Sequence, residues 1–299
     1  MLQASIPSSS GRTARDRADL DIGIIYTHER DFMGPLVESL ARSGPGLSMR
    51  LVLVDNVSGD GVDRWCRAFD RTVVVKNAHR LHYAANLNRI LQASTARYVL
   101  LLNTDMLFEP DVQCLTKMMR FMDATPDCGL AACRLYHTDG GYGFPARRYQ
   151  TLSTIAARRM PWGDFARGTV RRYLYADRSH YTAFDCQWVS GCFMFLRRET
   201  LEDVGLFDEG FGKYFEDVDY CLRVARAGWR VMLNGACYAY HFEQRASKSL
   251  FSPDAMKHLR SYARWWRKWG RDPWHALAAN RRPTLPIGDQ RAPRRADAA

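Results

Sequence analysis

Three short stretches of this sequence carry side chains that could bind a divalent cation or another ligand. In the first, an apolar run ends in Asn103-Thr104-Asp105. A carboxylate there is suited to holding Mg²⁺ or Mn²⁺ against a diphosphate, because these cations bind few protein carboxylates and complete their shells with phosphate oxygens and water. The alternative is an ordinary turn in which Asp105 caps the chain before Pro110.

The second stretch, Glu216-Asp217-Val218-Asp219, places three acids at the start of a predicted helix. Acids are common there because they favour the helix dipole and cap free N–H groups, so a purely structural role stays open. Successive helical residues point about 100° apart, so the three carboxylates cannot all serve one purpose. We expect Glu216 and Asp219 to project to neighbouring sides and Asp217 to face a different ligand.

The third stretch is the end of a predicted strand, where His241 follows Tyr240. A neutral imidazole binds transition-type divalent ions well, and a position at a strand end could bring His241 beside Asp105. A lone histidine is more often structural, and this alternative also stays open.

The elements that must position these residues alternate between short β-rich runs and helices. This alternation predicts an α/β fold with a mostly parallel sheet and helices on both faces. In such sheets, reactive polar residues lie just past the carboxyl ends of strands, at the crevice where the strand order reverses. The predicted strands are 21–27, 49–55, 72–76, 97–103, 187–197, 229–233 and 237–242, and the predicted helices are 35–42, 62–69, 83–93, 111–122, 199–204 and 216–227.

We expect one catalytic domain with appended ends. The predicted units are a disordered arm at 1–19, the α/β domain at 20–250, an amphipathic helical region at 251–283 and a disordered tail at 284–299. Within the domain, residues 20–136 are expected to bind a nucleotide, and residues 137–250 to bind the acceptor and carry the catalytic groups. Residues 137–185 are rich in Arg, Tyr and Gly and are predicted to be partly irregular.

The positive charge of the chain is concentrated at its end. The formal net charge is +11, and residues 256–299 hold eleven Lys or Arg but only three Asp. Such an end suggests an anionic partner, which could be nucleic acid, a membrane surface or a pyrophosphate-bearing substrate. Nucleic acid is disfavoured, because the acids line the predicted crevice and would repel it.

The helical region offers two interpretations. Aromatic residues such as Tyr262, Trp265 and Trp269 interleave with arginines and lysines. This pattern suits a helix lying on anionic lipid, but it also suits a helix whose aromatic face packs on the domain.

The cysteines and the apolar segments bear on localisation. None of the eight cysteines forms a CxxC pair, which indicates free, buried thiols in a reducing cytoplasm. The N-terminal segment has no apolar stretch typical of a secretory signal, and no apolar run approaches the roughly 18 residues that cross a bilayer. We therefore expect a cytoplasmic protein that is either free or peripheral on the inner face of the cell membrane.

The order of these motifs resembles the family 2 glycosyltransferases, which have the GT-A fold, and among them the rhamnosyltransferase-like group. The resemblance covers residues 21–247. Its most specific parts are Trp188-Val189-Ser190-Gly191, Arg197-Arg198-Glu199, Val204-Gly205-Leu206-Phe207-Asp208-Glu209, Phe215-Glu216-Asp217-Val218-Asp219-Tyr220-Cys221-Leu222-Arg223 and Ala227-Gly228-Trp229.

The resemblance implies a role for each matching position. Asp217 matches the catalytic base, and Asp105 and His241 match the ligands of a Mg²⁺ or Mn²⁺ ion. The positions that face the nucleotide are Thr27, Glu29, Asp55, Asn56, Asn77 and Asn88. Further positions around the donor sugar and the acceptor are Asn103, Thr104, Trp188, Gly191 and Glu216.

The implied activity is inverting, metal-dependent transfer of a hexose from a nucleoside diphosphate. The expected donor is dTDP-L-rhamnose, with UDP-hexoses as the alternative, and the expected acceptor is a hydroxyl of a glycan or of a lipid-pyrophosphate-linked glycan. The chain departs from the family at Asn103, where the first acid of the metal-binding motif usually stands, and at His82, where relatives often carry glycine. A nucleotidyltransferase is a weaker alternative, because no glycine-rich phosphate loop follows the first predicted strand.

Overall fold

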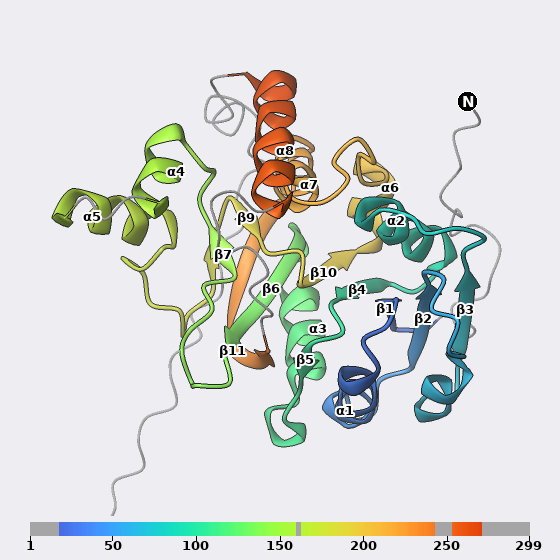
Figure 1. Ribbon diagram of the computed structural model, residues 1–299. Coiled ribbons are helices and arrows are strands. Elements are labelled where there is room, and N and C mark those ends of the chain that lie inside the picture. Colours follow the sequence, from blue (N-terminus) through green and yellow to red (C-terminus); the bar gives the residue numbers. More distant parts are fainter. Residues whose placement is uncertain (1–17, 160–162, 243–252, 271–299) are drawn as a thin grey trace, which may run out of the picture.

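The computed structural model describes residues 18–159, 163–242 and 253–270, and a nine-stranded sheet forms its centre (Figure 1). The strands lie side by side in the order β3 (Thr72–Lys76), β2 (Met49–Asp55), β1 (Leu20–Tyr26), β4 (Tyr98–Leu102), β10 (Phe193–Arg197), β6 (Cys128–Tyr136), β11 (Arg230–His241) and β5 (Met106–Leu107), and β8 (Phe184–Asp185) pairs with β11.

The sheet is mostly parallel, as predicted. Strands β3, β2, β1 and β4 run parallel to one another, and β6 runs parallel to β11. Strand β10 is antiparallel to β4 and β6, and β5 is antiparallel to β11. The chain builds outward from β1 to β2 and β3 on one side and to β4 on the other. The strand order therefore reverses between β1 and β4, where a crevice is expected at their carboxyl ends.

Helices cover both faces of this sheet. Helices α1 (Arg30–Ser43) and α3 (Cys114–Ala124) lie on one face, and α2 (Tyr83–Ala93), α6 (Arg198–Val204) and α7 (Glu216–Arg226) lie on the other (Figure 1). Helix α8 (Pro253–Trp269) lies beyond α7. None of the helices in the described ranges combines the length and the apolarity that crossing a bilayer requires.

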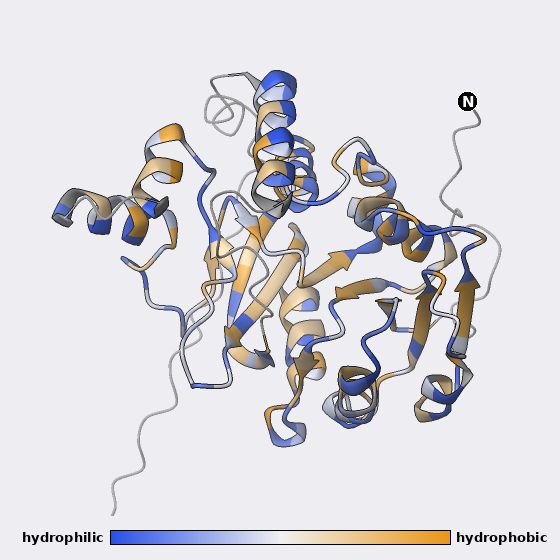
Figure 2. Cartoon of the chain, viewed as in Figure 1, coloured by the Kyte–Doolittle hydropathy of each residue, from blue (hydrophilic) through white to orange (hydrophobic). Residues whose placement is uncertain are grey.

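The strands are apolar because helices shield them on both sides, whereas the helices carry an apolar face and a polar face (Figure 2). All five residues of β4 are buried. Helix α2 approaches β1 closely at Gly23, where an added Cβ would lie 2.2 Å from Cγ2 of Ile90. This close packing holds α2 against β1.

Several predicted elements differ from the observed ones. Residues 137–185 contain β7 (Ala146–Arg147) and two helices, α4 (Leu152–Arg159) and α5 (Gly163–Tyr173), although this region was expected to be partly irregular. The predicted helix 62–69 is the 3₁₀ helix η1 (Asp63–Ala68), and 3₁₀ helix η2 (Pro110–Val112) precedes α3. Strand 187–197 divides into β9 (Trp188–Val189) and β10, and strands β5 and β6 had no predicted counterpart.

The two strands predicted at 229–233 and 237–242 form the single strand β11. The intervening Asn234-Gly235-Ala236 forms an irregularity at which the register with β6 shifts. A Cβ at Gly235 would lie 2.4 Å from the carbonyl carbon of Tyr181, so the glycine permits a close approach of two backbone segments. Strand β11 thereby continues as far as His241.

The expected domain organisation is only partly covered by the described residues. Residues 1–17 and 284–299, predicted as disordered ends, lie outside them, and the predicted helical region 251–283 is represented by α8. The sheet does not divide at residue 136, because β6 from the first predicted half lies between β10 and β11 from the second. All eight cysteines are free, and all except Cys66 are buried, as predicted.

Candidate active site

Two neighbouring cavities lie at the carboxyl ends of the strands. The smaller, of about 340 Å³, is lined by six of the predicted residues: Thr27, Glu29, Asn56, Asn103, Thr104 and Asp105. The larger, of about 910 Å³, is lined by Gly191, Glu216, Asp217 and His241 and again by Asn103 and Asp105. Four residues line both cavities, namely Tyr83, Asn103, Asp105 and Lys213. The cavities therefore meet at Asp105.

Hydrogen bonds of Asn56 and Asn77 hold the loop beside the smaller cavity, and of these two residues only Asn56 lines the cavity. Asn56 forms two bonds with the backbone of Leu81, accepting from its N–H at 2.9 Å and donating to its carbonyl oxygen at 3.3 Å. Asn77 donates to Oδ1 of Asn56 at 3.0 Å. His82 adopts a φ of −71°, so the chain needs no glycine at this position. Asn56 and Asn77 together fix the loop that leads into α2.

Four predicted nucleotide-sugar contacts do not line either cavity: Asp55, Asn77, Asn88 and Trp188. Their polar atoms serve the fold. Oδ1 of Asp55 accepts from the N–H of Ser58, and the indole N–H of Trp188 donates to the carbonyl oxygen of Arg148. Asn88 is buried and exchanges hydrogen bonds with the backbone N–H and carbonyl oxygen of Phe207.

Asp217 lies in the first turn of α7 and is held by two N–H groups. Its Oδ2 accepts from Gly191 at 3.0 Å, and its Oδ1 accepts from Val218 at 2.8 Å. Burial raises the pKa of Asp217, although these two N–H groups and the charge of Arg147 oppose the shift. A carboxylate with a raised pKa is a stronger base than an exposed one.

Glu216 and Asp217 both line the larger cavity, and Asp219 does not. The prediction that Glu216 and Asp219 project to neighbouring sides, with Asp217 turned away from both, is therefore wrong, because Glu216 and Asp217 face the same cavity. Glu216 and Asp217 are the first two residues of α7, and Phe215 before them has a φ of +69°. Burial and the charge of Asp217 raise the pKa of Glu216 well above its ordinary value.

Asp105 and His241 approach each other across two antiparallel strands. Their Oδ1 and Nε2 atoms lie 3.3 Å apart, because β5 pairs with the end of β11 so that Met106 stands opposite His241. Nε2 of His241 is buried and makes no hydrogen bond with the described residues. Burial lowers the pKa of His241, but Asp105 and the neighbouring Cys192 outweigh this effect and raise it to about 10.

This pair fits a divalent cation that takes its remaining ligands from substrate and water. The carboxylate oxygen suits Mg²⁺ or Mn²⁺, the imidazole nitrogen suits a transition-type ion such as Mn²⁺, and a cation there would take the place of the imidazole proton. Within the described ranges, no group of three or more His, Cys, Asp or Glu side chains could hold a metal by itself. The donor's phosphates would therefore complete the shell.

Tyr83 and Lys213 are site residues that the sequence did not reveal. The hydroxyl of Tyr83 lies 2.9 Å from Oδ1 of Asn103 and 3.2 Å from the carbonyl oxygen of Gly191. Tyr83 thus links the segment that carries Asp105 to Gly191, whose N–H binds Asp217. Tyr83 is merely the first residue of α2, and Lys213 precedes the acidic run of α7. No motif marks either residue in the sequence.

Comparison with known proteins now identifies the family. Residues 21–205 match the family model described as glycosyl transferase family 2. The chain belongs to this family. The resemblance inferred from the motifs is therefore confirmed, including its rhamnosyltransferase-like character, because rhamnosyltransferases are among the matching relatives.

This family 2 glycosyltransferase matches only part of its curated relatives. It is 26% identical over 170 residues to rhamnosyltransferase WbbL of Escherichia coli (strain K12), which covers 56% of this chain and 61% of that protein. It is 33% identical over 88 residues to the N-acetylglucosaminyl-diphospho-decaprenol L-rhamnosyltransferase of Mycobacterium tuberculosis, which covers 27% of this chain and 29% of that protein. The chain thus spans less than two thirds of the length of either relative.

Solved glycosyltransferase structures share its GT-A fold. The mannosyltransferase PcManGT from Pyrobaculum calidifontis, solved with GDP-Man and Mn²⁺, superposes with a TM-score of 0.60 at 17% identity over 91% of this chain and 69% of that one. Residues 1–349 of S. aureus TarS, solved with UDP-GlcNAc, give a TM-score of 0.57 at 16% identity over 87% of this chain and 70% of that one. At these identities, the likeness concerns the fold.

Proposed function

We propose that this family 2 glycosyltransferase moves a sugar from a nucleoside diphosphate to an acceptor hydroxyl, with inversion at the anomeric carbon. The proposed donor is dTDP-L-rhamnose, and both rhamnosyltransferase relatives support this choice. The observation that carries the proposal is the meeting of the two cavities, which puts the Asp217 carboxylate in a space that opens onto Asp105. Donor and acceptor can therefore lie on either side of one reacting carbon.

The nucleotide is proposed to occupy the smaller cavity. Thr27, Glu29 and Asn56 line it below the carboxyl ends of β1 and β2, where this fold class binds nucleotides. Glu29 is pre-positioned, because its Oε2 accepts from the N–H of Thr27 at 2.7 Å and from that of His28 at 2.9 Å. The sugar would then extend past Asn103 into the larger cavity.

Asp105 and His241 are the residues that would hold Mg²⁺ or Mn²⁺. When bound, the cation neutralises negative charge that develops on the departing diphosphate. Thr104 and Asn103 precede Asp105 on the same turn, and the Tyr83 hydroxyl bonded to Asn103 keeps this turn in place. The single carboxylate of this motif makes the imidazole of His241 an essential part of the site.

Asp217 is the proposed general base. The acceptor oxygen attacks the anomeric carbon from the face opposite the diphosphate, a new C–O bond forms, and the bond to the diphosphate oxygen breaks. The hydroxyl proton passes to the Asp217 carboxylate, whose orientation Gly191 and Val218 maintain through their N–H groups. Attack from the opposite face inverts the anomeric configuration.

The acceptor is proposed to be a glycan or a lipid-pyrophosphate-linked glycan. Arg147 and Arg158 line the larger cavity and would favour an anionic acceptor. Arg147 lies over the ring of Trp188, with its guanidinium carbon 5.2 Å from the ring centroid, so this buried residue supports the acceptor side indirectly. The name of the mycobacterial relative specifies a diphosphate-linked lipid acceptor, which agrees with this choice.

The outer face of α8 is the proposed contact with an anionic membrane. Met256, Leu259 and Trp266 are exposed on this helix, with relative exposures of 50%, 48% and 45%, and their spacing puts them on one face. The exposed Arg260 and Arg267 lie along one edge of that face and complement anionic lipid.

Liposome flotation tests the membrane contact. The intact protein should float with vesicles of phosphatidylglycerol and phosphatidylcholine but not with phosphatidylcholine alone. Replacing Met256, Leu259 and Trp266 together by serine should abolish flotation while the transferase activity in detergent persists. Equal flotation of wild type and triple variant would contradict the contact.

A donor screen tests the proposed activity. The purified protein would be incubated with Mn²⁺, a lipid-diphosphate-linked acceptor and either dTDP-L-rhamnose, a UDP-hexose or GDP-mannose, and the product examined by mass spectrometry and NMR. We expect transfer from dTDP-L-rhamnose with an inverted anomeric carbon. If the protein prefers a UDP-hexose, the proposed donor is wrong but the proposed inverting sugar transfer stands. Release of inorganic pyrophosphate with nucleotide transfer would instead indicate a nucleotidyltransferase.

A further inference from the structure

A lysine stands where the two cavities meet. Of the four residues that line both cavities, Lys213 is the only cationic one. Its side chain is exposed, and its charge is close enough to lower the pKa of the neighbouring Glu216. If the nucleoside lies in one cavity and the sugar in the other, as the proposed function requires, the diphosphate that joins them must pass this junction.

The charges at the junction favour a second cationic group, such as the lysine ammonium, in addition to a metal ion. The motif that would hold the metal has Asn103 in place of one acid, and Asp105 contributes a single carboxylate. A divalent cation neutralises only part of the charge on a departing nucleoside diphosphate. An ammonium group on the other side of the junction would stabilise the remaining charge as the bond to the sugar breaks.

Lys213 belongs to a constrained loop. Residues 205–215, which we call the α6–α7 loop, connect α6 to α7, and Tyr214 and Phe215 at its end adopt φ angles of +74° and +69°. Side chains of this size rarely adopt left-handed backbone, so surrounding contacts must hold the loop in this form.

Helix α8 supplies those contacts. The hydroxyl of Ser261 donates to the carbonyl oxygen of Lys213 at 2.9 Å. The buried rings of Tyr262 and Trp265 pack against Phe215, with centroid separations of 5.6 and 6.1 Å. The backbone of Lys213 is therefore fastened to α8, while its side chain stays available to a ligand.

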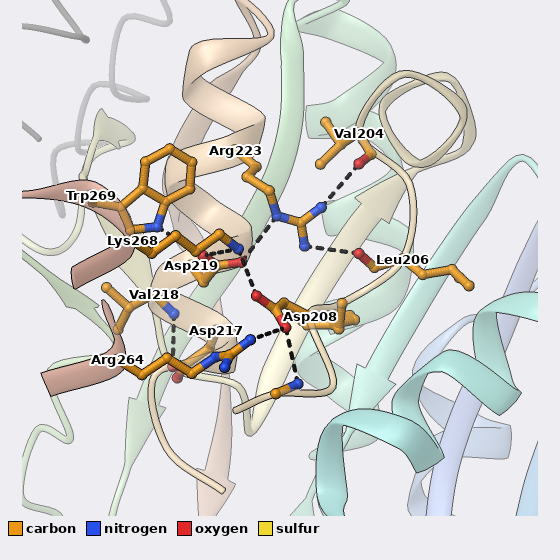
Figure 3. A network of polar contacts seen from close by, with 12 residues as sticks. Val204, Leu206, Asp208, Asp217, Val218, Asp219, Arg223, Arg264, Lys268 and Trp269 are labelled. Atoms are coloured by element: carbon orange, nitrogen blue, oxygen red, sulfur yellow. Dashed lines mark hydrogen bonds and ion pairs between the residues drawn. The ribbon is translucent and has the colours of Figure 1, made fainter. Parts of the chain in front are cut away.

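A polar network fastens the middle of the same loop to α8 (Figure 3). Asp208 accepts from Arg264 at 3.0 Å and from Lys268 at 2.8 Å. A Cβ at Gly210 would lie 1.9 Å from Nη2 of Arg264, so the glycine lets the guanidinium pass directly over the backbone.

The same network of polar contacts also includes Asp219 of α7, the helix that carries Asp217. Asp219 of α7 is fully buried and accepts from the indole N–H of Trp269 at 2.8 Å, and Lys268 lies 2.8 Å from the same carboxylate oxygen (Figure 3). On its other side, Asp219 binds Arg223 at 3.0 Å. Helix α8 thus forms polar contacts with both the α6–α7 loop and α7, the helix that carries Asp217.

We propose that Lys213 is a catalytic residue that contacts the donor's diphosphate, and that α8 positions it by holding the α6–α7 loop. This inference rests on the proposed function. It gives α8 a positioning role in the reaction, because Ser261 and Arg264 hold the loop that carries Lys213. This role is separate from the proposed membrane contact of the outer face of α8.

Calorimetric titration with dTDP and dTMP, in the presence of Mn²⁺, tests the contact. Lys213→Met removes the ammonium and keeps the backbone bond to Ser261, so the protein should stay folded. We expect dTDP affinity and turnover to fall about 10- to 100-fold, as for loss of one hydrogen bond to a charged group, with dTMP affinity little changed. Lys213→Arg should restore most of the loss.

Lys257→Met is the matched control, because Lys257 is exposed on α8 and lines neither cavity. If Lys213→Met binds dTDP as Lys257→Met does, the inference is overturned while the proposed function stands. If the wild type itself binds no nucleoside diphosphate, the proposed function fails first.

A double-mutant cycle tests the positioning role of α8. Arg264→Ala should lower dTDP affinity in the wild type but should have little further effect in Lys213→Met, because Arg264 is proposed to act through Lys213. If Arg264→Ala lowers dTDP affinity by the same factor in the wild type and in Lys213→Met, α8 only stabilises the fold. That result would overturn the proposed positioning of Lys213 by α8.

Discussion

Oδ1 of Asp105 lies 3.3 Å from Nε2 of His241, although the two residues are far apart in the sequence. The two-residue strand β5 creates this proximity by pairing with the last residues of β11. Phe242 strengthens the junction, because its N–H donates to the carbonyl oxygen of Asp105 at 2.9 Å. The proposed metal site, with Asp105 and His241 as its protein ligands, would depend on this short pairing.

Removing the metal should stop the reaction. We expect a chelator to abolish turnover, and added Mn²⁺ or Mg²⁺ to restore it. His241→Ala should raise the Mn²⁺ concentration needed for half-maximal activity by at least about 10-fold, because it removes one of two ligands. Activity in excess chelator, or an unchanged Mn²⁺ requirement in the variant, would count against a metal at this pair.

Activity should rise with pH as Asp217 loses its proton. A general base works in its deprotonated form, and burial raises the pKa of Asp217 above the ordinary range of aspartate. The acidic limb of the kcat/KM profile should therefore lie at higher pH than for an exposed carboxylate.

Arg147→Gln provides the matched test of this assignment. The charge of Arg147 lowers the pKa of Asp217, so its removal should move the acidic limb to still higher pH. A limb that moves to lower pH, or does not move, would argue that another group titrates.

Glu216→Gln should stabilise the protein at neutral and alkaline pH. Burial and Asp217 raise the pKa of Glu216 in the folded state, so folding disfavours its charged form. Stability of the wild type should fall relative to the variant as pH rises above the ordinary pKa of glutamate, and the difference should vanish in acid. Thermal unfolding from acidic to alkaline pH measures this difference, and a variant less stable than the wild type at alkaline pH would refute the explanation.

Sequence reasoning worked best for residues at strand ends. Asp105 and His241 were expected to meet because each follows a strand, and parallel strands deliver their ends to one edge. Sequence reasoning worked less well for the asparagine side chains that were predicted to face the nucleotide. Asn77 and Asn88 match positions of the family that face the nucleotide, yet their amide groups hold neighbouring loop and backbone atoms. Periodicity does not reveal where a polar side chain finds its partner.

The sequence also missed features that depend on distant contacts. Lys213 lines both cavities, its backbone accepts a hydrogen bond from Ser261 of α8, and no local pattern in the sequence encodes that contact. For α8 itself, the sequence is compatible with two interpretations, packing on the domain and contact with lipid. Tyr262 and Trp265 are buried against the domain, which confirms packing, while lipid contact through the outer face stays a prediction.

The central claim is that Asp217 takes the acceptor's proton beside a bound nucleoside diphosphate. Turnover and dTDP affinity of Asp217→Asn, measured on the same preparation, test it most directly. Asparagine keeps the shape and can still accept the N–H of Gly191, so the account predicts a roughly 10²- to 10⁴-fold loss of turnover with dTDP affinity almost unchanged. Near wild-type turnover would contradict the account.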